Sequence, residues 1–100
     1  MIRGTTPNHI FSLPFGTEMI KTIEITYAQD GTVKLTKGND GCTFDGNTVS
    51  VKLSQKETLM FIEGTCVDVQ IRVLTMGGDV VASNIMRMHC DECLSDGVLS

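Results

Sequence analysis

The chain has 100 residues, of which 41% are hydrophobic and 20% charged, with a net charge of −4. These values are typical of one folded domain and argue against intrinsic disorder and against a second core. Eight basic residues against twelve acidic ones leave no clustered positive charge, so nucleic acid is not an expected partner. No apolar run is long enough for a membrane span and no signal peptide is predicted, so no membrane partner is expected.

Alternating apolar residues predict a series of short strands. The first, His9–Phe15, contains Pro14 and is expected at a sheet edge, because proline cannot donate a hydrogen bond to a neighbouring strand. Met19–Tyr27 alternates, with Ile23, Ile25 and Tyr27 on one face and Thr22, Glu24 and Thr26 on the other, which indicates a half-buried strand. Cys66–Thr75 shows the clearest alternation, and we expect it in the middle of a sheet.

Turn residues separate these strands at intervals of about 8 to 12 residues, as in β-sandwiches. Gln29–Gly31 predicts a tight hairpin, and Gly38–Gly41 and Asp45–Asn47 predict two further turns. The strands expected after these turns are centred on Val33 and Leu35, on Cys42–Phe44, and on Val49, Val51 and Leu53.

A Ser-x-x-Glu pattern at Ser54 and Glu57 is typical of a capped helix N-terminus. We expect one helical turn here that crosses from one sheet to the other. Leu59 or Phe61 should then close the bottom of the core.

The last strand is expected at Val80–Cys90, after a hairpin turn at Met76–Asp79, with a bulge near Ser83 and Asn84. The polar stretch that follows should fray or lie on a neighbouring chain. The pattern therefore predicts an all-β protein: an antiparallel, immunoglobulin-like β-sandwich of about seven strands. Residues 1–93 would form this single domain and residues 94–100 a C-terminal tail.

Cys90 and Cys93 have Cys-x-x-Cys spacing, and His89 lies beside them. This set could contribute to a zinc site, but a closed site needs four ligands and the other histidine and cysteines are scattered singly. We therefore expect no metal and no other cofactor, and interpret the cysteines as free thiols, with Cys42 and Cys66 as small core residues. A disulfide between Cys42 and Cys66 is the disfavoured alternative.

The two histidines, His9 and His89, are expected at the surface or in hydrogen bonds rather than as ligands or bases. Motifs for a serine nucleophile, a phosphate-binding glycine loop or paired catalytic carboxylates are missing, so no enzyme is expected. Three acidic residues near the C-terminus are interpreted as a solvated charged face rather than a calcium site: Asp91, Glu92 and Asp96.

Five apolar residues near the C-terminus are candidates for a contact surface. Met86 and Met88 share one face of the last strand, where they are either an exposed, adaptable pair or returned to the core by the bulge. Leu94, Val98 and Leu99 lie in the polar tail, and together with free strand edges they are expected to contact other chains.

The segments Met1–Pro7, Tyr27–Gln29, Asp45–Val51, Leu53–Leu59 and Val69–Gly78 carry a family resemblance. They span nearly the whole chain, which resembles a group of short β-sandwich proteins encoded by prophages and tailed phages of Firmicutes. The Cys-x-x-Cys is not part of this group's pattern, and no functional residue can be carried over from it.

The resemblance implies a bacteriophage origin and a non-enzymatic virion structural or accessory protein of the head, tail or baseplate. Its partners would be other phage structural proteins, as a homo-oligomer or in many copies, in the host cytoplasm during assembly and then in the virion. One alternative is a non-virion phage protein that binds a host factor or regulates assembly. A small zinc- or thiol-dependent enzyme is the third.

Overall fold

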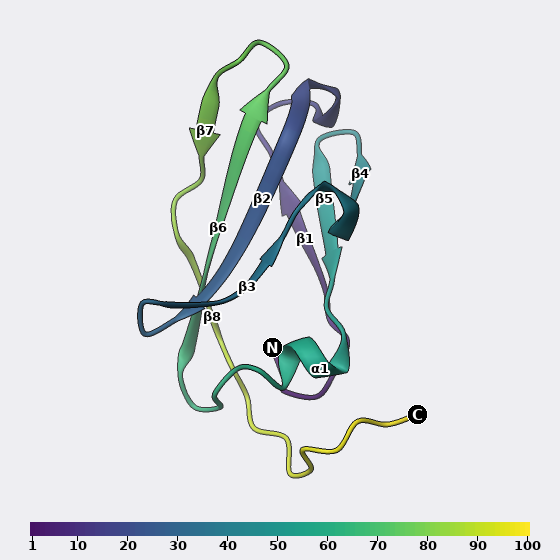
Figure 1. The fold of residues 1–100 in the computed structure, drawn as a ribbon, viewed down its shortest axis with the longest axis vertical. Helices are drawn as coiled ribbons and strands as arrows, with labels where there is room; N and C mark the ends of the chain where they lie inside the picture. The colour runs from purple at the N-terminus through teal and green to yellow at the C-terminus, as the bar shows by residue number, and fades with distance from the viewer.

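The computed structural model describes residues 1–100 as two sheets packed face to face (Figure 1). The strands are β1 (Asn8–Ser12), β2 (Ile20–Gln29), β3 (Thr32–Lys37), β4 (Cys42–Asp45), β5 (Thr48–Lys52), β6 (Cys66–Thr75), β7 (Val80–Ala82) and β8 (Met86–His89). The helical turns are η1 (Thr17–Met19), η2 (Asn39–Gly41) and α1 (Gln55–Thr58).

The smaller sheet has the order β1–β5–β4, and the larger has the order β3–β2–β6, with β7 and β8 both paired to the free side of β6. All pairs between named strands are antiparallel, and one isolated parallel bridge joins Ile2 to Asp91. The predicted antiparallel sandwich is confirmed, with eight strands in place of about seven. The immunoglobulin-like classification stays a prediction.

The core lies between the sheets and comes mainly from the two long strands, β2 and β6. The alternation predicted from the sequence is confirmed, because the inward residues of both strands are buried while their neighbours are not. These inward residues are Ile23, Ile25 and Tyr27 on β2, and Val67, Val69, Ile71 and Val73 on β6.

Local sequence signals explain how the strands are joined. Asp30 and Gly31 have φ angles of 49° and 75°, so the β2–β3 hairpin needs the residue types that tolerate the left-handed region. In α1, Ser54 Oγ accepts from the Glu57 amide at 3.1 Å, while the Glu57 carboxylate accepts from the Ser54 amide at 2.8 Å. The predicted capping box is confirmed, and the chain beyond α1 places Phe61 in the core.

The last strand is divided into β7 and β8 by a break at residues 83–85. Val81 pairs with Val73 and Met86 with Val69, so five steps along this strand match four along β6. The Ser83 side chain bridges the gap, because its Oγ accepts from the Ile71 amide at 3.0 Å. The predicted bulge is confirmed, with one extra residue in the strand.

The bulge decides between the two interpretations of Met86 and Met88. Both side chains are partly buried and pack against the core, opposite Val69 and Val67 of β6. The prediction of an exposed methionine contact pair is therefore wrong, because one inserted residue shifts the alternation and turns both side chains inward.

The prediction of Cys66 as a core residue also needs correction. Cys66 is exposed rather than a core residue, because it begins β6 on the outward face, and Cys90 is the fully buried cysteine; all four cysteines are free. In the structure the tail lies along its own chain, and whether it frays or contacts a neighbouring chain stays a prediction. The Gln55 side chain binds the backbone N and O of Leu99 at 2.7 and 2.9 Å.

Candidate functional site

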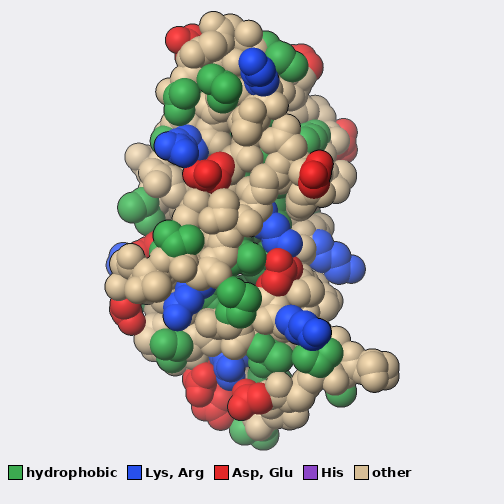
Figure 2. All heavy atoms as spheres, in the orientation of Figure 1, with side chains coloured by type: hydrophobic (Ala, Val, Ile, Leu, Met, Phe, Trp, Pro, Cys, Tyr) green, Lys and Arg blue, Asp and Glu red, His purple; other side chains and the backbone are tan.

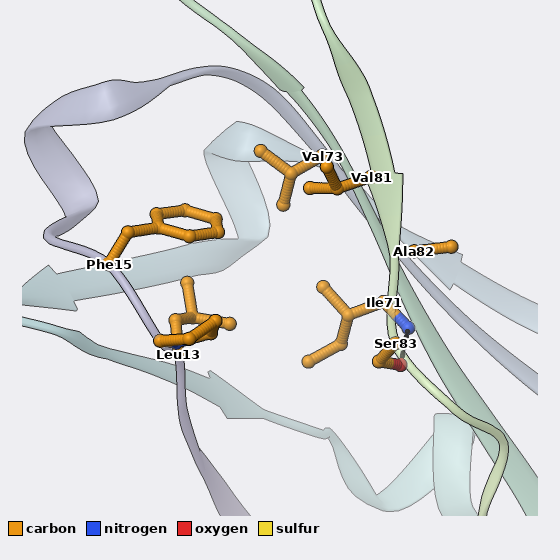
Figure 3. A pocket seen from close by; sticks show the side chains of 8 residues that line it. Leu13, Phe15, Ile71, Val73, Val81, Ala82 and Ser83 are labelled. Carbon is orange, nitrogen blue, oxygen red and sulfur yellow. Dashed lines mark hydrogen bonds between the residues drawn. The ribbon is translucent and has the colours of Figure 1, made fainter.

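An apolar groove opens between the two sheets on the side where β1 and β7 are the edges. Its volume is about 270 Å³. In Figure 3, Leu13 and Phe15 point into it from the segment that follows β1, and Ile71, Val73 and Val81 face them from β6 and β7. The remaining lining residues are Pro14, Ala82 and Ser83.

The groove exists because both edges are short there. β1 ends before Pro14, which has no amide hydrogen to continue the ladder, and the chain then leaves the small sheet. On the other side β7 has only three residues before the break. The space between Leu13 and Val81 is therefore open at the side of the sandwich, whereas Ile71 behind it is buried.

The lining holds no charged group, and its one polar side chain is already bonded. Ser83 Oγ donates to the Asn84 carbonyl at 2.9 Å and accepts from the Ile71 amide, while the Ser83 amide donates to the Ile71 carbonyl at 2.8 Å. What remains is hydrocarbon surface. The groove can therefore bind an apolar group by burial, and it offers no acid, base or nucleophile for a reaction.

The outer face of the large sheet has a different character. Figure 2 shows Lys, Arg, Asp and Glu side chains interspersed with single hydrophobic ones over the face seen there. One shallow hollow on this sheet lies around Glu24 and Arg72, which form an ion pair at 3.2 Å with side chains 44% and 62% exposed. Such a pair is screened by solvent, so this face carries no concentrated charge at that point.

The zinc candidates His89, Cys90 and Cys93 do not converge. His89 faces outward from β8, with Nε2 3.5 Å from Asp91 Oδ1, whereas the next residue, Cys90, is buried on the opposite side. Successive residues of an extended segment point to opposite faces, so this spacing separates the side chains. Cys93 lies beyond the strand, and no three His, Cys, Asp or Glu side chains in the structure lie close enough together to hold a metal ion.

The acidic residues near the C-terminus are also spread apart. Asp91 lies beside His89, Glu92 is exposed, and Asp96 accepts from Arg3 at 2.9 Å. The Arg3 guanidinium also donates to two backbone carbonyls after α1 and pairs with Glu63 at 3.2 Å. Arg3 therefore links the N-terminal segment, the end of α1 and the tail.

The other histidine, His9, is hydrogen-bonded as predicted. Its Nδ1 lies 2.7 Å from the hydroxyl of Tyr27, which is 0% exposed. Burial lowers the pKa of His9, and the nearby N-terminal ammonium lowers it further. Burial also raises the pKa of Tyr27, so the phenol stays neutral at physiological pH.

The apolar tail residues that were predicted to contact other chains remain open to solvent. Leu94 and Leu99 are 96% and 82% exposed, and Val98 is about half exposed. None of them lines the groove. Their role as a contact surface stays a prediction.

Comparison of the chain with protein-family models, curated proteins and solved structures gave no match. No helix of the structure is long and apolar enough to cross a membrane.

The groove was not among the features predicted from the sequence. Leu13 and Phe15 flank Pro14 at the end of the predicted edge strand, and two large apolar residues around a strand-ending proline were the available signal. The sequence gives no comparable signal for Val81 on the opposite wall, because the orientation of Val81 depends on its pairing with Val73.

Proposed function

We propose that this chain is a non-enzymatic protein-interaction module that serves as a structural or accessory component of a bacteriophage particle. It would act in many copies and contact other structural proteins of the head, tail or baseplate. The observation that carries the interaction role is the open groove between the sheets, with its mainly apolar lining around Leu13, Phe15 and Val81. The phage context rests on the sequence resemblance.

The groove fits one or two apolar side chains presented by an extended segment of a partner. Burying a leucine- or phenylalanine-sized side chain contributes about 1.5–3 kcal/mol. The groove lies between the edges of β1 and β7, where an incoming strand also meets unpaired backbone groups. Val81 is 42% exposed, and its pairing with Val73 places it on the inner face of β7, where such a partner would meet it.

Mass spectrometry of purified particles tests the particle role directly. The expected result is recovery of this chain in a fixed ratio to the other structural proteins. Its absence from particles would contradict the proposal, and co-purification with host proteins from infected cells would favour the non-virion alternative.

A matched pair of substitutions on β7 tests the groove. Val81→Asp puts a carboxylate into the apolar lining, and burying that charge without a partner is costly, so incorporation into particles should fall. Val80→Asp is the control, because Val80 is 63% exposed and registered with the outward residue Leu74. Equal incorporation of both variants, each folded by circular dichroism, would show that the groove is not the contact surface.

A further inference from the structure

The Tyr27 hydroxyl has a single hydrogen-bond partner, and that partner is on an edge strand. The Tyr27 hydroxyl on β2 lies 2.7 Å from His9 Nδ1 on β1. A buried phenol hydrogen without an acceptor is costly, so the hydroxyl donates and Nδ1 accepts. His9 is therefore the tautomer that carries its proton on Nε2.

Aromatic rings surround this hydrogen bond. The Tyr27 ring packs edge-on against Phe61 with centroids 6.1 Å apart, and the His9 ring packs against Phe11 at 6.4 Å. β1 pairs only with β5, where His9 is registered opposite Val51. The His9 hydrogen bond thus joins the edge of the small sheet to the centre of the large one.

The charged and titratable groups around the pair do not favour a histidine cation. Burial raises the pKa of the Tyr27 phenol, and the charges of Cys42 on β4 and Glu57 on α1 raise that pKa further. Cys42 and His9 are both registered opposite Val51. Glu57 is already paired with Lys37 at 2.6 Å. No hydrogen bond or salt bridge joins His9 to a carboxylate, and the Met1 ammonium opposes its protonation.

We propose that His9 is an acid-sensitive latch that holds β1 in the sandwich, and that a proton taken up from solvent at Nδ1 releases the strand. Once Nδ1 carries a hydrogen, it no longer accepts from Tyr27, and the phenol hydrogen is left unbonded inside the core. Moving β1 away restores water to both groups. The wall of the groove formed by Leu13 and Phe15 follows β1 directly and moves with it. This proposal does not depend on the phage role.

The direction of the pH effect follows from proton linkage. Because the folded state lowers the pKa of His9 below its ordinary value of 6.5, the released state binds a proton at a higher pH than the docked state. Docking of β1 therefore weakens as the pH falls below 6.5 and reaches a lower limit beneath the folded pKa.

Amide hydrogen exchange on the full chain at about pH 7.5 and about pH 5 tests the latch. After correction for intrinsic exchange, protection should fall by up to about tenfold per pH unit in the titration window. The reporter amides lie at the two ends of the β1–β5 pairing: Leu13, which donates to Asn47 O at 2.8 Å, and Leu53, which donates to Pro7 O at 3.0 Å. The amides of β6 should keep their protection.

Two histidine variants separate the latch from general acid effects. His9→Gln should abolish the pH dependence at β1, whereas His89→Gln, at the exposed histidine of β8, should retain it. Equal protection of β1 at both pH values in the wild-type chain would overturn the proposal, as would an unchanged pH dependence in His9→Gln.

A measurement on the unmodified chain covers the case in which His9→Gln does not fold. Nitrogen-15 NMR of the imidazole at neutral pH should show the proton of His9 on Nε2 and none on Nδ1. A proton on Nδ1 would mean that Tyr27 accepts rather than donates, and the latch would be refuted.

Discussion

Replacing Gln29 with alanine should destabilise the protein by about 3 kcal/mol. Gln29 is 2% exposed, and its side chain makes three hydrogen bonds to the segment before β6. Its amide nitrogen donates to Ile62 O at 2.8 Å and to Thr65 Oγ1 at 2.7 Å, and its oxygen accepts from the Ile62 amide at 2.8 Å. Each bond contributes about 1 kcal/mol net, and the partly buried partners can recover some of this with water. The space left by the side chain adds about 1 kcal/mol.

Gln70→Ala is the matched control, since Gln70 is exposed on β6 and makes one bond, to Ser83 O at 3.1 Å. Its removal should cost no more than about 0.5 kcal/mol. Urea unfolding followed by circular dichroism measures both free energies, provided the slope with denaturant is the same for each variant. If the two variants differ by less than about 0.5 kcal/mol, Gln29 does not anchor this segment and the reasoning is refuted.

Glu57→Gln keeps the helix cap but removes the ion pair with Lys37, so it should cost about 0.5–1 kcal/mol at neutral pH by urea unfolding. Although burial acts in the opposite direction, the hydrogen bond and charge of Lys37 lower the pKa of Glu57 below its ordinary 4.5, so wild-type stability should fall on acidification below pH 4.5. The variant should lack this part of the loss, and parallel pH profiles would contradict the assignment. Among the thiols, Cys66 is exposed and should react quickly with a neutral alkylating reagent. Cys90 is buried, and burial raises the pKa of its thiol, so it should react only on unfolding; mass spectrometry of labelled peptides that finds Cys90 modified first would contradict this.

The sequence predicted well where a local rule acts alone. Strict alternation identified β2 and β6, because only one register buries all their branched residues. The Asp30–Gly31 turn and the Ser54 cap were equally local, since each depends on residue types within four positions.

The sequence could not decide the orientation of side chains that follow an inserted residue. It left Met86 and Met88 either exposed or returned to the core by a bulge, and the bulge at Ser83 shifts the inward face by one residue and turns both inward. Gln29 was assigned to a turn, although β2 extends through it and its amide satisfies Ile62 across the sandwich. Such partners lie more than thirty residues away, so no local pattern indicates them.

The walls of the groove limit how strongly it can bind. Ile71 and Val73 are only 3% and 2% exposed before any partner arrives, so an incoming side chain gains chiefly from its own burial and from covering Val81. A single apolar contact of about 1.5–3 kcal/mol changes an equilibrium constant by only about ten- to hundredfold. One copy of this chain would therefore hold a partner weakly through the groove alone. In the proposed multi-copy assembly, linked copies would multiply such weak contacts without a new site, so a weak single contact is compatible with that proposal.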